Sequence, residues 1–160
     1  MQKVRLLCVG KLKDSWLRDG CYEYSKRLGG LCQFEQIEVA DEPLPTKLNA
    51  TIQEQILYRE GERLVRVLTR GDYVIALTLK GKMLDSEGLA LKLSDLALNG
   101  NSSVAFIIGG SLGLGSNILS LTQEELCLSQ LTFPHQLCRL ILMEQIYRAF
   151  SIQNGMAYHK

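Results

Sequence analysis

Hydrophobic positions along the chain alternate between short continuous runs and longer stretches with helical spacing. Val4–Val9, Tyr73–Leu79 and Val104–Ile108 are short apolar runs, and Phe34–Val39 alternates apolar with polar residues. Runs of this length predict strands, which are buried on both faces where the run is continuous. A fifth strand is expected at Leu128–Phe133.

Helical spacing fills the segments between these strands. Asp14 or Ser15 is expected to cap the first helix, which stops at Gly29-Gly30. The other expected helices are Ile52–Thr69, Ser86–Leu98, Asn117–Glu125 and Gln136–Gln153. Strands alternating with helices indicate an α/β fold with a mainly parallel five-stranded sheet flanked by helices, in a single domain spanning 1–160.

Composition narrows the class of protein. The 160 residues carry a formal net charge of +1, so any nucleic-acid partner must be held by a local patch or by one formed on oligomerisation. The five cysteines are odd in number and contain no CxxC pair, which favours reduced thiols over a disulfide framework or a zinc site. No segment reaches the roughly 18 apolar residues of a membrane span. We therefore expect a cytoplasmic protein with neither a metal nor a membrane attachment.

The glycine-rich segment at 109–115 directly follows the fourth strand and allows several interpretations. Residues 109–113 match the GxSxG pattern of a serine-hydrolase elbow, for which Glu124 or Glu125 and His135 could complete a triad. That elbow must enter a helix at once, whereas 114–116 prolong the loop with poor helix formers. The match to a dinucleotide fingerprint is partial, and a plain tight turn is a further alternative. We favour a loop whose bare backbone approaches a ligand at the carboxyl end of a strand.

The last helix and the tail concentrate the remaining chemistry. Residues 140–143 are apolar on all sides, which indicates either a core helix or, as we favour, a helix shared between the core and a homodimer interface. Glu144 and Arg148 have the spacing of a structural ion pair. Both histidines of the chain lie in this region, and the chain ends in an aromatic ring, an imidazole and a cation at 158–160.

Several of these motifs together resemble the RlmH (YbeA-like) family of SPOUT methyltransferases. The motifs are IIGGSLGLG at 107–115, LTFPHQLCRLILMEQIYRAF at 131–150, the terminal YHK, VGKLKD at 9–14, EGERL at 60–64 and ALTLKGKMLDSEGLA at 76–90. The resemblance covers essentially the whole chain. It implies a trefoil-knotted α/β domain, a homodimer and S-adenosyl-L-methionine as methyl donor. It also implies a substrate: a pseudouridine of 23S rRNA, methylated at N3 in the stem-loop that faces the decoding centre of the assembled ribosome.

Two sets of site residues are expected, the first implied by the resemblance and the second suggested by the chemistry of the last helix and the tail. The expected cofactor-binding set is Leu77, Gly109, Gly110, Leu128, Ser129, Gln130, Leu131, Thr132 and Phe133. The expected catalytic set is His135, Arg139, Glu144, Arg148, Tyr158 and His159.

Roles for the catalytic set follow from side-chain chemistry. Imidazole exchanges protons near neutral pH, so His159 is a candidate base for the N3 proton. Arg139 or Arg148 could stabilise negative charge on the uracil carbonyls, and Tyr158 could stack on the base. Which group takes the proton stays open. A cofactor-sensing or ribosome-binding module without turnover is the alternative from a different class.

Overall fold

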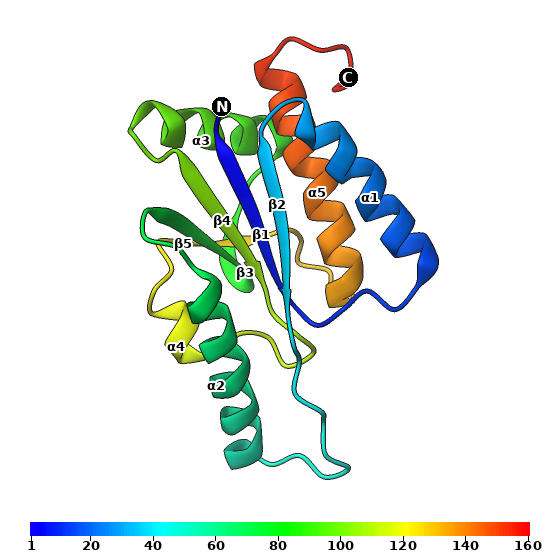
Figure 1. Cartoon of the computed structure of the whole chain (residues 1–160), viewed down its shortest axis with the longest axis vertical. Coiled ribbons are helices and arrows are strands. Elements are labelled where there is room, and N and C mark those ends of the chain that lie inside the picture. The colour runs from blue at the N-terminus through cyan, green and yellow to red at the C-terminus, as the bar shows by residue number, and fades with distance from the viewer.

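A five-stranded, entirely parallel sheet forms the centre of the molecule (Figure 1). The computed structural model describes all of residues 1–160. The strands are β1 (Lys3–Val9), β2 (Gln33–Val39), β3 (Asp72–Met83), β4 (Ser103–Ile108) and β5 (Glu124–Cys127). Their order across the sheet is β2-β1-β4-β3-β5.

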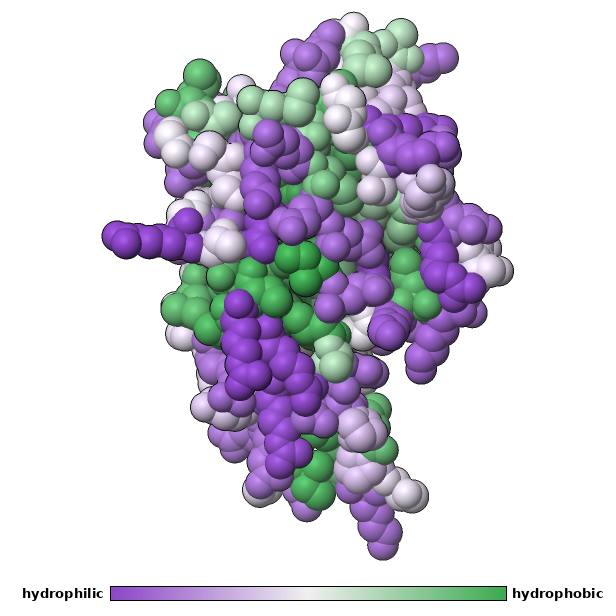
Figure 2. All heavy atoms as spheres, in the orientation of Figure 1, coloured by the Kyte–Doolittle hydropathy of each residue, from purple (hydrophilic) through white to green (hydrophobic).

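Helices cover both faces of this sheet. They are α1 (Ser15–Gly29), α2 (Ala50–Val67), α3 (Ser86–Leu98), α4 (Ser116–Leu119) and α5 (His135–Gln153). The larger core joins α1, α3 and α5 to one face, and a smaller core joins α2 and α4 to the other. Alternate residues of β1 enter the two cores, as expected for a central strand: Leu6 faces the first and Leu7 the second. Figure 2 shows hydrophobic surface over the middle of the sheet and strongly hydrophilic surface below it, over α2.

The first four strands and most helices lie where the sequence predicts them, but two predictions in the C-terminal half are wrong. The predicted helix 117–125 ends after Leu119, because the Thr122 hydroxyl donates to the Leu119 carbonyl (2.7 Å) and closes the last turn. The fifth strand is Glu124–Cys127, which pairs with β3, whereas 128–133 is a loop. An apolar loop resembles a short strand in sequence because both are buried, so hydrophobicity alone could not separate them.

Helix α5 runs antiparallel to the strands. It starts near their carboxyl ends and finishes near their amino ends, where the tail folds back beside α1 (Figure 1). The sequence predicts that α5 is half core and half interface, but Leu142 and Ile146 are fully buried inside a single chain. These two residues are therefore part of the protomer core. A knotted path for the segment between β4 and α5, which the resemblance implies, stays a prediction.

The five cysteines are free thiols, four of them buried. None of the helices is both long enough and apolar enough to cross a membrane.

Candidate functional site

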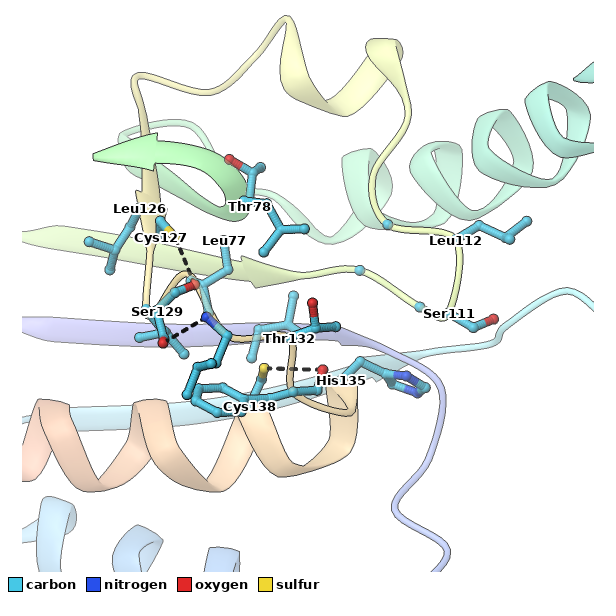
Figure 3. Close-up of a pocket in the computed structure, with 18 residues that line it drawn as sticks. Leu77, Thr78, Ser111, Leu112, Leu126, Cys127, Ser129, Thr132, His135 and Cys138 are labelled. Atoms are coloured by element: carbon cyan, nitrogen blue, oxygen red, sulfur yellow. Dashed lines mark hydrogen bonds between the residues drawn. The ribbon is translucent and has the colours of Figure 1, made fainter. Parts of the chain in front are cut away.

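A cavity of about 330 Å³ lies beside β3 and the carboxyl ends of β4 and β5 (Figure 3). Its walls come from 77–79 of β3, from 108–113 after β4, and from parts of 126–138 between β5 and α5. Open parallel sheets bind ligands at the carboxyl ends of their strands, so this is the expected place for a site.

The glycine-rich loop forms one wall of this cavity and folds tightly on itself. The Gly113 N–H donates to the Gly110 carbonyl (3.0 Å), and the two residues form an isolated antiparallel bridge. A Cβ atom on Gly109 would lie 2.3 Å from the Gly113 carbonyl oxygen, and Gly113 itself has a φ of +89°. Glycine is therefore required at both positions for the loop to close, and the cavity wall here is bare backbone.

The loop between β5 and α5 forms the opposite wall and is fixed by local hydrogen bonds (Figure 3). The Leu131 N–H donates to the Ser129 hydroxyl oxygen (3.0 Å), and the Cys127 thiol lies 3.0 Å from the Ser129 carbonyl oxygen. These bonds give an irregular segment a defined shape, which a ligand-binding wall needs.

The cavity carries signs of an incomplete environment. Thr78 lines it, and its hydroxyl oxygen is buried without a hydrogen-bond partner. Leu79 and Leu131 also line it but are 70% and 71% exposed. An orphaned polar atom and uncovered apolar walls are both features that a bound molecule or a second chain would resolve.

All of the predicted cofactor-binding residues except Gln130 line this cavity. Gln130 lies in the same loop, but its side chain is exposed to solvent. Sequence reasoning missed Thr78 and Leu79, because it ended the third strand at Leu79 and treated only Leu77 as part of the site. It also missed Cys138, on the first turn of α5.

The predicted catalytic residues fall into three separate places. His135, at the start of α5, lines the cavity. Burial, with a further contribution from the Arg139 charge, lowers the pKa of His135 below its ordinary value, so its imidazole is neutral at pH 7.

Arg139 lies in the interior, where it joins α5 to the ends of β1 and β2. Its guanidinium is 1% exposed and donates to Glu38 (2.5 Å) and to the Gly10 carbonyl (3.0 Å). This placement gives Arg139 a structural role and does not support the predicted contact with a nucleobase.

Glu144, Arg148, Tyr158 and His159 meet at the far end of α5, a group we call the tail cluster. Tyr158 donates to the Glu144 carboxylate (3.0 Å) and lies 3.1 Å from the Tyr24 hydroxyl. Arg148 pairs with the same carboxylate (2.5 Å) and has one nitrogen 3.2 Å from His159 Nδ1. Burial and these hydrogen bonds raise the pKa of Tyr158. The tail is therefore a built structure with its polar groups paired.

Arg148 comes thirteen positions after His135 along α5. At a rise of 1.5 Å per residue, the two residues are about 20 Å apart. The tail cluster and the cavity of one chain are thus two distinct places.

The GxSxG interpretation finds no support in this geometry. Ser111 is exposed and forms no hydrogen bond with His135. Helix α4 begins only at Ser116, so the serine does not lie on a direct strand-to-helix turn. No group of three or more His, Cys, Asp or Glu side chains is arranged to hold a metal ion.

Comparison with known proteins identifies this arrangement. A family model described as "Predicted SPOUT methyltransferase" matches residues 2–159. The chain belongs to the SPOUT methyltransferase family. The sequence-based resemblance to SPOUT methyltransferases is thereby confirmed.

Several relatives of this SPOUT chain are named "Ribosomal RNA large subunit methyltransferase H". The protein from Desulforamulus reducens is 49% identical over 160 residues, covering 100% of both chains. Those from Streptococcus suis and Bifidobacterium adolescentis are 48% and 49% identical over 158 residues, covering 99% of both chains.

A solved structure supports the fold. It is titled as a probable methylase family protein from Haemophilus influenzae Rd KW20, and it aligns with a TM-score of 0.54 at 13% identity. The alignment covers 98% of this chain and 70% of that one.

Proposed function

We propose that this SPOUT methyltransferase uses S-adenosyl-L-methionine to methylate N3 of a pseudouridine in 23S rRNA. The target lies in the stem-loop that faces the decoding centre of the assembled ribosome, and the enzyme acts in the cytoplasm as a homodimer. Support for an rRNA substrate comes from full-length relatives that are named as large-subunit rRNA methyltransferases. The observation that carries the proposal is the cavity whose lining matches the expected cofactor set in all but one residue.

The cavity suits the proposed methyl donor. Its volume is within the range of small-molecule sites, its walls are mainly apolar, and the glycine-rich loop brings backbone groups to its surface. When bound, S-adenosyl-L-methionine supplies a methyl group on a positively charged sulfur.

The protein's contribution is to align the acceptor nitrogen and to remove its proton. N3 of the base gains the methyl carbon and loses its proton, so a proton acceptor is required. We assign that role to His159, with Tyr158 stacking on the base and Arg148 stabilising negative charge on the uracil carbonyls. In the tail cluster, Arg148 faces His159 Nδ1. His159 therefore accepts a proton at that nitrogen only after the tail leaves this contact.

The distance between tail and cavity supports a site built from two copies. A tail about 20 Å along α5 from His135 cannot serve the cavity of its own chain without unravelling. The exposed leucines at the cavity, Leu79 and Leu131, offer apolar surface for a second chain to cover. Ile141 of α5 is half-buried and is a further candidate for the interface. We propose that the tail of one protomer completes the cavity of its partner.

The test combines binding and transfer. Isothermal titration should show S-adenosyl-L-methionine binding, and tritiated methyl transfer should label ribosomes that lack the modification, at a position mapped by mass spectrometry of the 23S rRNA. Binding without transfer would favour the non-catalytic module, and failure of both would overturn the proposal. A fluorophosphonate probe should leave Ser111 unlabelled.

A further inference from the structure

A second and larger cavity, of about 810 Å³, adjoins the first. It lies between the carboxyl ends of β1 and β2, the loop 40–44 and the start of α5. Gly110, Ser111 and His135 line both cavities, so these residues form a shared wall. Figure 3 shows Ser111 and His135 projecting from the same end of the first cavity.

Glu60 of α2 lines this second cavity and is 5% exposed. Its Oε2 accepts the Glu42 N–H (2.9 Å), but its Oε1 is buried with no hydrogen-bond partner. Oε1 lies close to the shared wall, because a Cβ atom on Gly110 would be 3.4 Å from it. Burial raises the pKa of this carboxyl.

The rest of the EGERL motif is explained by packing. Gly61 lets α2 approach Asn117 of α4, where a Cβ atom would lie 2.2 Å from the side-chain oxygen. Arg63 donates to the Ala40 carbonyl and to Glu42 (both 2.9 Å), and Leu64 is in the smaller core. Glu60 Oε1 is buried without such a structural role, so it is the atom that we expect a ligand to engage.

The rim of the second cavity carries charges of both signs: Asp41 is exposed there, and Glu38 and Glu42 are paired with Arg139 and Arg63. Lys11 and Lys13 are exposed there, and neither forms an ion pair. Two unpaired lysines near an unpartnered acceptor fit a molecule that carries both a phosphate and an N–H donor. A nucleotide has both groups, and a volume of this size accommodates one.

We propose that the second cavity receives the target nucleotide and that Glu60 Oε1 accepts the N1–H of its base, so that Glu60 selects pseudouridine over uridine. This inference rests on the function proposed above. In uridine N1 is bonded to the ribose and carries no hydrogen, whereas pseudouridine is attached through C5 and keeps a free N1–H.

The geometry of the pseudouridine ring allows N1 to contact Glu60 while N3 faces the shared wall. N1 and N3 flank the same C2 carbonyl, so a base whose N3 faces the shared wall turns N1 towards a neighbouring surface of the same cavity. Glu60 is at that surface, beside Gly110. Lys11 and Lys13 would hold the flanking phosphates.

The test is the preference between two substrates, which a purely structural role would not change. Wild-type protein should methylate ribosomes with pseudouridine at the target more efficiently, in kcat/KM, than ribosomes with uridine there. Glu60→Gln should reduce this preference about tenfold. An amide has only one oxygen, so its NH₂ group would have to face either the Glu42 N–H or the N1–H, and two donors would then oppose each other. Its affinity for S-adenosyl-L-methionine should not change. Glu62→Gln, two residues away on the same helix and outside the cavity, is the matched control.

The alternatives give different results. If Glu60 only fixes the loop 40–44, Glu60→Gln will slow transfer to both ribosomes equally, which overturns the proposal. Absence of preference in the wild type also overturns it but leaves the methyltransferase function standing, whereas absence of transfer to either substrate removes both.

A measurement on the wild type covers the case in which the variant does not fold. Pseudouridine monophosphate should inhibit transfer more strongly than uridine monophosphate, and equal inhibition would contradict the assignment.

Discussion

The two ends of α5 differ in how completely their polar groups are satisfied. At the C-terminal end, Tyr158, Glu144 and Arg148 form a closed set of short contacts, with Tyr158 packed edge-on against Tyr147 at 4.8 Å. At the N-terminal end, near His135, Arg139 Nε, Thr78 Oγ1 and Glu60 Oε1 are buried without a partner, and two leucines are mostly exposed.

Unpaired buried polar groups indicate a binding site more reliably than the number of reactive side chains does. The tail cluster contains more reactive side chains, but its groups already hold one another. The cavity end contains fewer, but they are unpaired, and an unpaired buried group is where a ligand gains most. This contrast supports the proposal that the cavity end binds the ligand and that the tail acts on a second copy once it leaves these contacts.

The largest effects are expected from substitutions that distinguish the buried face of α5 from its outer face. Leu142 is fully buried, so Leu142→Asp should abolish folding and Leu142→Ala should cost about 3 kcal/mol. Ile141 is half-buried beside it, so Ile141→Asp should fold but weaken the homodimer. Circular dichroism and light scattering measure the two effects. A folded Ile141→Asp dimer of unchanged stability would remove α5 from the interface.

A substitution that opens the glycine-rich loop tests the cavity end alone. Gly109→Ala places a Cβ atom against the Gly113 carbonyl, so the loop must open, and affinity for S-adenosyl-L-methionine should fall at least about tenfold. Thermal stability should change much less than affinity. Gly29→Ala is the matched control, since nothing lies within 4 Å of its Cβ. Titration calorimetry that finds equal affinity in both variants would exclude this loop from the site.

Sequence reasoning from hydrophobic runs and turns revealed the strands and the glycine-rich loop, whereas the resemblance supplied the cavity wall at 128–133, which the hydrophobic pattern had assigned to a strand. It placed four strands correctly, and it found Gly109 and Gly110 from the loop motif. It could not find Glu60, because an unpartnered oxygen becomes visible only when α2, the 40–44 loop and Gly110 are brought together. It grouped Arg139 with the tail cluster because sequence spacing does not show that this guanidinium points inward to Glu38.

Removal of the tail tests the other end of α5. Deletion of 158–160 should leave a folded protein that binds S-adenosyl-L-methionine but no longer methylates ribosomes. A modest loss of thermal stability is expected, because Tyr158 packs against Tyr147. His159→Ala should reduce turnover more than cofactor affinity, and Lys160→Ala is its control. Full activity of the truncated protein would move the search for the base to His135.

The smallest expected effect is a pH dependence that belongs to the cavity end. Burial and the Arg139 charge lower the pKa of His135 in the folded state, opposed in part by Asp41. Unfolding therefore takes up a proton once the pH falls below the ordinary histidine value of about 6.5, and the folded state loses stability until the pH passes its own lower pKa. His135→Gln should flatten the melting temperature between pH 7.5 and 5.5. Protonation would also place a positive charge on the cavity wall, so affinity for the cationic S-adenosyl-L-methionine should fall over the same range in the wild type and less in the variant. Identical pH profiles for both proteins would show that His135 is solvated and does not belong to the wall.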